Sequence, residues 1–324
     1  MGLWKLRFTM WGTLALLISI STLVFAAALT LIGSLSLYTM LIFVIFWNLI
    51  QWLIAPYMIG AIYHAKPADE SQYGDLNRMI DDLSLKSEIR RPKLMIADIP
   101  LPNAFAYGSP VSGPRVAVTT GLLKELETEE VEAVVGHELG HLKHRDVQIM
   151  MFASVIPAVF YMLGYSLMWS GMLGGGRRNN AGIAVLVGVA LMGVYWLLTL
   201  LVLGLSRLRE YYADRHSASI VYDGPRKLSE GLAKIVRVSG KLRSKRQNTA
   251  AFNSFKSLFI ADPDRAARDE VAIYRGTSYS SDQMLVRDVI SQRITGTDRL
   301  VEVFSTHPNI VKRLKALQEL ESSG

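Results

Sequence analysis

Three long stretches of this 324-residue chain contain no Asp, Glu, Lys or Arg: residues 8–65, 147–176 and 179–206. A helix that crosses a bilayer needs about 20 predominantly apolar residues. The first stretch has room for two such helices, at about 9–32 and 36–58, and each of the other two has room for one. The pattern therefore predicts four membrane spans arranged as two hairpins.

The basic residues near the ends of the spans predict the orientation of the chain. Most of them fall on one side of the four-span arrangement: Lys5, Arg7, Lys66, Lys143, Arg145, Arg207 and Arg209. Arg177 and Arg178 fall on the other side, and they leave open that the second hairpin only dips into the membrane. We expect a multi-pass protein of the cytoplasmic membrane whose polar parts face the cytosol. Its N-terminus resembles a signal peptide, but the apolar run is too long, which favours an uncleaved anchor.

Two polar segments complete the chain. The membrane hairpins occupy 1–65 and 147–206, and the polar segments are 66–146 and 207–324. The second polar segment has 21 basic and 14 acidic residues, which accounts for the whole net charge of +7. Anionic lipid is the natural partner of this charge in a membrane protein. Nucleic acid is not expected, because the sequence shows neither a basic stripe interleaved with aromatic residues nor zinc-finger spacing.

Short patterns in the first polar segment predict its secondary structure. Apolar residues recur with helical spacing over 69–85. Three runs are typical of strands, at 93–97, 103–108 and 115–120. Thr128 is the expected N-cap of a helix that runs to about 145, because acidic residues follow in its first turn. The predicted fold class is mainly α with a small antiparallel β-sheet, and the second polar segment is expected to be mostly helical.

The helix expected at 128–145 contains His137-Glu138-Leu139-Gly140-His141. Histidines at i and i+4 lie one turn apart on the same face, so both imidazoles can reach one zinc ion. Glu138 stands beside the first ligand and can act on a metal-bound water. The alternative is a helix whose polar residues face solvent, but the apolar flanks of the motif indicate a packed helix. The sequence has no Cys, which excludes thiolate ligands and a thiol nucleophile.

Two histidines leave a catalytic zinc one protein ligand short. Glu210 and Asp214 follow the last uncharged stretch at i and i+4, hence on one helix face. Glu210 can supply the third ligand, while Asp214 can accept a hydrogen bond from the far nitrogen of a ligand histidine. Taken alone, these residues would be a salt-bridged helix end, and only the histidine motif favours the ligand interpretation.

Several motifs together resemble the HtpX-type membrane zinc metalloproteases, whose wider clan includes the CAAX prenyl-protein endopeptidases. The matching motifs are Asn103-Ala104-Phe105-Ala106, the helix from Thr128 to Asp146, the block Glu210–Asp214, and His307-Pro308 with Arg313. The resemblance implies a gluzincin-like fold with one zinc per chain. It also implies a quality-control and stress-response endopeptidase at the cytosolic face, acting on polypeptides and above all on membrane proteins. The family resemblance is also compatible with assembly of the chain into a homo-oligomer.

The resemblance also implies roles for the remaining motif residues. Asn103, Ala104, Phe105 and Ala106 look like an edge strand that pairs with an extended substrate, although an ordinary core strand explains Phe105 equally well. His307 and Arg313 look placed to stabilise the oxyanion or to modulate the zinc. The simpler alternative is that His307-Pro308 caps the last helix. The variable region at 240–300 matches no known motif.

Two rival functions remain open. A prenyl-peptide processing protease shares the motifs, but it builds a larger chamber from seven helices, so four predicted spans disfavour it. A non-catalytic membrane scaffold or chaperone would use the His and Glu residues structurally. The predicted spans have no ionisable residue near their centres, which disfavours a transporter.

Overall fold

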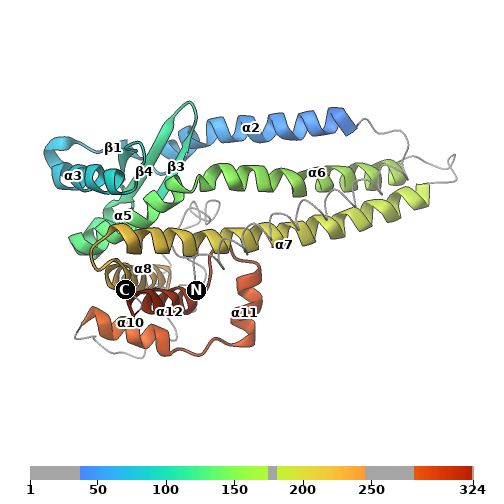
Figure 1. The fold of residues 1–324 in the computed structure, drawn as a ribbon. Coiled ribbons are helices and arrows are strands. Elements are labelled where there is room, and N and C mark those ends of the chain that lie inside the picture. Colours follow the sequence, from blue (N-terminus) through green and yellow to red (C-terminus); the bar gives the residue numbers. More distant parts are fainter. Residues whose placement is uncertain (1–36, 174–180, 245–280, 323–324) are drawn as a thin grey trace. The chain divides into compact units, whose positions relative to one another are not determined.

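The computed structural model describes residues 37–173, 181–244 and 281–322 (Figure 1). The expected first span at 9–32, the turn at 174–180 and most of the variable region lie outside these residues. The chain forms two compact units. Of the described residues, one unit combines Leu53–Val147 with those from Arg207 onward, and the other combines those between Gln148 and Ser206 with those up to Trp52.

The described residues are mainly helical, as predicted. The helices are α2 (Leu37–Ile62), α3 (Glu70–Lys86), α4 (Thr120–Glu125), α5 (Thr128–Lys143), α6 (Asp146–Leu173), α7 (Ala181–Ile220), α8 (Gly224–Ser244), α10 (Asp282–Ser291), α11 (Gly296–Val303) and α12 (Ile310–Glu321). The strands are β1 (Lys66–Pro67), β2 (Lys93–Ala97), β3 (Ala104–Ser109) and β4 (Gly113–Thr119). Figure 1 shows α8, α10 and α12 packed together, and their buried apolar side chains share one core with α5.

The sheet is mixed, so the prediction of an antiparallel sheet is wrong. Its strand order is β1-β2-β4-β3. The short turn at 110–112 makes β3 and β4 an antiparallel hairpin, in which Phe105 pairs with Ala117. The hairpin places β4, and not β3, beside β2, so β4 runs parallel to β2 with Met95 opposite Ala117. This order leaves β3 at the edge of the sheet, next to α5.

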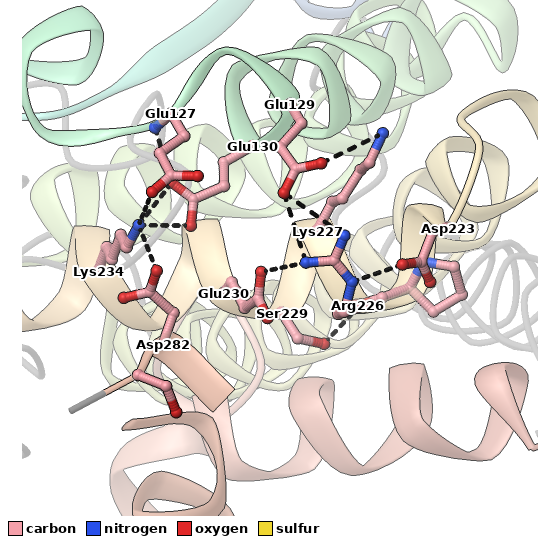
Figure 2. Close-up of polar contacts among 12 residues, drawn as sticks. Glu127, Glu129, Glu130, Asp223, Arg226, Lys227, Ser229, Glu230, Lys234 and Asp282 are labelled. Atoms are coloured by element: carbon pink, nitrogen blue, oxygen red, sulfur yellow. Dashed lines mark hydrogen bonds and ion pairs between the residues drawn. The ribbon is translucent and has the colours of Figure 1, made fainter. Parts of the chain in front are cut away.

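The helix α5 begins one residue earlier than predicted, because Glu127 and not Thr128 is its N-cap. The backbone N–H of Glu127 donates to the carboxylate of Glu130 at 2.8 Å. Figure 2 shows how α8 holds this helix start: Lys234 lies 2.8 Å from Glu130 and 2.9 Å from Asp282 of α10. A second cation, Arg226, connects Glu230 of its own helix with α5. Ion pairs thus join α5, α8 and α10.

Close packing between α5 and α7 depends on small residues. A Cβ atom added to Gly140 would lie 2.9 Å from the Cα of Ala213, and one added to Gly136 would lie 3.1 Å from the hydroxyl of Ser217. This hydroxyl donates a 2.6 Å hydrogen bond to the carbonyl of Ala133. We call this contact the glycine seam of α5 and α7. The two helix backbones approach closely only because Gly136 and Gly140 carry no side chain.

Within the described residues, two helical segments are long and apolar enough to cross a membrane: Asp146–Met172 and Ala181–Ile220. A shorter apolar helical segment, Trp52–Ile62, forms the last part of α2. Large apolar side chains are exposed along these helices, including Phe152, Trp169 and Trp196. Exposed aromatic and aliphatic surface of this extent suits contact with lipid. These helices agree with the second predicted hairpin, while the number of spans stays a prediction.

Candidate metal and catalytic site

Three side chains from two helices converge inside the first unit. The Nε2 atoms of His137 and His141 lie 3.2 Å apart. The two carboxylate oxygens of Glu210 lie 3.7 Å from Nε2 of His137 and 3.5 Å from Nε2 of His141. A tetrahedral zinc with bonds of about 2.0–2.1 Å places its ligand atoms about 3.3 Å apart. The donor set therefore has the chemistry and approximate spacing of a zinc site.

Carboxylates hold the far nitrogen of both histidines. Nδ1 of His137 lies 2.9 Å from Asp214, and Nδ1 of His141 lies 2.6 Å from Asp146. Arg209 in turn lies 3.1 Å from Asp146. Such carboxylates orient a ligand imidazole and increase its basicity. Asp214 is predicted from the sequence and Asp146 is not, although Asp146 follows His141 by five residues, at the turn that ends the motif helix.

Arg313 from α12 contacts the carboxylates of Asp214 and Glu210. Its guanidinium is 1% exposed and donates to both oxygens of Asp214, at 2.9 and 2.5 Å. It also lies 3.2 Å from Glu210. His307 is buried, with Nδ1 3.2 Å from Glu210. The N-cap of α12 is Asn309, so His307 does not cap this helix.

The edge strand β3 contacts the remaining motif residue. The backbone N–H of Ala106 donates to the carboxylate of Glu138 at 2.7 Å. The side chain of Phe105 is buried between Tyr63 and Tyr107, with ring centroids 4.9 and 5.5 Å away, so it belongs to the core. Asn103 precedes the strand and is buried, and Ala104 is buried at its first position. Of the strand residues named from the sequence, Ala106 reaches the site through its backbone.

Burial changes the proton affinity of the site. It raises the pKa of Glu138 to about 7, since water is excluded from the carboxylate. It lowers the pKa of His137, which favours the neutral imidazole that binds metals. Burial also opposes the charged form of His141, but Asp146 and Glu210 outweigh it and raise the pKa of this histidine to about 9. The negative charges of Asp146 and Glu210 that raise this pKa also favour a divalent cation beside His141.

Two further histidines in the first unit, His144 and His216, have structural contacts. His144 follows α5 as its C-cap, and its ring packs at 5.4 Å from the ring of Tyr212. His216 lies 3.0 Å from the hydroxyl of Ser87. These contacts suit a structural role for both histidines.

The fold and the site define a membrane metalloprotease. The solved structure of Ste24p from S. mikatae matches the fold with a TM-score of 0.56 at 15% sequence identity. The match covers 97% of this chain and 66% of that one, so this chain spans slightly less than two thirds of the length of Ste24p.

The chain belongs to Peptidase family M48, whose model matches residues 70–321. A protease HtpX homolog of Thermoplasma acidophilum is 38% identical over 90% of this chain and 88% of its own length. Another, from Aeropyrum pernix, is 39% identical over 85% of this chain and 83% of its own. The resemblance to HtpX-type proteases is thereby confirmed.

Proposed function

We propose that this protein is a zinc-dependent endopeptidase that hydrolyses peptide bonds of misfolded or damaged membrane proteins at the cytosolic face of the cytoplasmic membrane. The observation that carries the proposal is the convergence of His137, His141 and Glu210, whose donor atoms lie 3.2–3.7 Å apart. Membership of a peptidase family supports the reaction class.

These three residues would hold one zinc ion per chain. The ion would supply Lewis acidity toward the scissile carbonyl and toward an attacking water. A catalytic zinc with three protein ligands keeps one position open for water or substrate. Asp214 and Asp146 hold the two imidazoles in the orientation that presents Nε2 to the ion.

Glu138 is the proposed general base. Its pKa of about 7 lets the carboxylate accept a proton from water near neutral pH and return it to the leaving amine. The 2.7 Å hydrogen bond from Ala106 holds the carboxylate beside the edge strand. No covalent intermediate with the protein is needed, so no nucleophilic Ser or Cys is required.

The edge strand β3 is the proposed substrate-binding element. One side of β3 pairs with β4, and the N–H of Ala106 faces the catalytic carboxylate on the other side. An extended substrate can add to this open edge through backbone hydrogen bonds, which accept many sequences. Such binding suits a broad quality-control protease. Asn103, Ala104 and Phe105 would support the strand and not touch the substrate, because they are buried.

Arg313 is proposed to position the site and not to stabilise an oxyanion. Its guanidinium is occupied by Asp214 and Glu210, so it links the third ligand to the carboxylate that orients His137. His307 remains the better candidate for contact with the reacting carbonyl. Its Nε2 atom is buried and has no hydrogen-bond partner among the described residues.

The proposal is tested on detergent-purified protein by measuring bound metal and casein cleavage before chelation, after chelation and after zinc is restored. We expect one zinc per chain and cleavage that is lost on chelation and regained with zinc. Glu138→Gln should retain zinc and abolish cleavage, while Glu125→Gln, an exposed carboxylate on α4, should leave both unchanged. Persistent cleavage by purified Glu138→Gln would contradict the assignment of the base, and absence of zinc binding would contradict the site.

A further inference from the structure

The short helix α11 has the reverse of the burial pattern expected on a surface that faces water. Its residues Leu300 and Val303 and its C-cap Phe304 are 65%, 38% and 62% exposed. Glu302, one of its two acidic residues, is buried instead, and it accepts a 3.0 Å hydrogen bond from the backbone of Asn309. The exposed apolar positions i, i+3 and i+4 lie on one face of the helix. We call these three side chains the apolar face of α11.

The end of α11 is tied to the start of the polar part of α7. Arg207 donates through Nη1 to the carbonyls of Val303 and Ser305, at 3.0 and 2.8 Å. In the same helix, Arg207 directly follows Ser206, the last residue of an uncharged stretch that begins at 179. A cation at this position suits the headgroup level of a bilayer, where Lys and Arg flank membrane spans. The hydrogen bonds therefore keep α11 near the level at which α7 leaves the membrane.

From this arrangement we propose that the apolar face of α11 inserts into the lipid surface, so that α11 lies as an interfacial helix beside Arg207 of α7. Interfacial helices bury their apolar face about 5–10 Å into the boundary between headgroups and acyl chains. The exposed residues Arg293 and Arg299 lie before and within the helix, where they suit anionic headgroups.

A second copy of the chain is a poorer occupant of this face. A helix of eight residues is about 12 Å long, and only three apolar side chains are exposed on it. Stable protein interfaces bury about 800 Å² on each partner, which is more than such a patch provides. A lipid surface needs no matching shape, so three side chains beside an existing membrane anchor are sufficient.

The consequence concerns the position of the site. His307 follows α11 after only three intervening residues, and Arg313 lies in the next helix. Insertion of α11 would hold this part of the site close to the bilayer surface, where loops of membrane proteins emerge. The inference rests on the membrane location of the protein and does not require that the peptidase reaction occurs.

The test uses the full-length protein reconstituted into vesicles of phosphatidylglycerol and phosphatidylcholine. Because the chain has no Cys, Leu300→Cys and Phe304→Cys each accept a single nitroxide spin label. Tyr222→Cys is the matched control, since Tyr222 is 88% exposed and follows the end of α7. Ile220 lies about 21 Å beyond Ser206 along the helix, so this position is well outside the bilayer.

We expect labels at 300 and 304 to collide readily with oxygen, which concentrates in lipid, and rarely with a water-soluble nickel complex. The ratio of the two collision rates should be several-fold higher than at 222. Equal exposure to the nickel complex at all three positions would overturn the proposal. Shielding from both reagents at 300 and 304 would also overturn it, because it would assign the face to a protein partner. Neither result depends on zinc or on cleavage, so the proposed function is tested separately.

Discussion

The glycine seam between α5 and α7 makes a quantitative prediction about the metal site. Gly140 directly precedes His141, a proposed ligand on α5, and Ala213 lies three residues after Glu210, the proposed third ligand on α7. The distance between these backbones therefore determines how close Glu210 comes to His141, which is 3.5 Å from it. Gly140→Ala is the smallest change that tests this dependence.

The size of the effect follows from the geometry. The added Cβ would lie 2.9 Å from the Cα of Ala213, whereas carbon atoms pack best at about 3.5–4.0 Å. The helices must then separate by about 0.6–1 Å, and the carboxylate of Glu210 moves with α7. Metal sites tolerate about 0.2 Å in their ligand distances. We expect zinc affinity to fall by about ten- to a hundredfold, as when groups that hold the ligands are lost.

The stability of the protein should change less than its metal affinity. Overpacking costs about 1–3 kcal/mol, while replacing Gly by Ala inside a helix contributes about 1 kcal/mol in the opposite direction. The free energy of unfolding of the metal-free protein should therefore fall by about 0–2 kcal/mol. Zinc affinity is measured by competition with a chromophoric chelator, and stability by denaturant unfolding in detergent.

Gly231→Ala provides the matched control. Gly231 also lies inside a helix, α8, but a Cβ added there would lie 3.4 Å from its nearest neighbours, an ordinary contact. This variant should keep the zinc affinity of the parent and gain up to about 1 kcal/mol in stability. If Gly140→Ala bound zinc as tightly as the parent, the reasoning that the seam sets the ligand distance would be refuted.

Two further predictions concern buried carboxylates. Asp146→Asn removes the anion 2.6 Å from His141 and should weaken zinc binding about ten- to a hundredfold in the same chelator assay, whereas Asp75→Asn on the exposed face of α3 should not. Lys234→Met leaves the buried Glu130 without its cation and should lower the free energy of unfolding by about 1–3 kcal/mol at neutral pH. Because burial raises the pKa of Glu130 and a protonated carboxyl tolerates burial, this deficit should shrink as the pH falls. A deficit that stayed constant in acid would contradict this explanation.

Local sequence patterns were sufficient for much of the fold and for the core of the site. Uncharged stretches predicted the long helices α6 and α7, because a helix that crosses lipid must be apolar along its whole length. The i, i+4 spacing of His137 and His141 placed both on one helix face, since that geometry is a property of the helix itself. These features depend on neighbours in the chain, so the sequence alone determined them.

The tertiary structure decided the features that depend on distant residues. The hairpin of β3 and β4 inserts β4 beside β2, which makes the sheet mixed, and no local pattern encodes the order of strands. Arg313 contacts Asp214, 99 positions earlier in the chain, and lies 3.2 Å from Glu210, so its position favours modulation of the proposed metal site over contact with the oxyanion. The apolar face of α11 is exposed because the helix packs with Glu302 inward, where this carboxylate accepts a hydrogen bond from the backbone of Asn309. Packing between distant segments decides which side chains are covered, and this is information that a linear pattern does not carry.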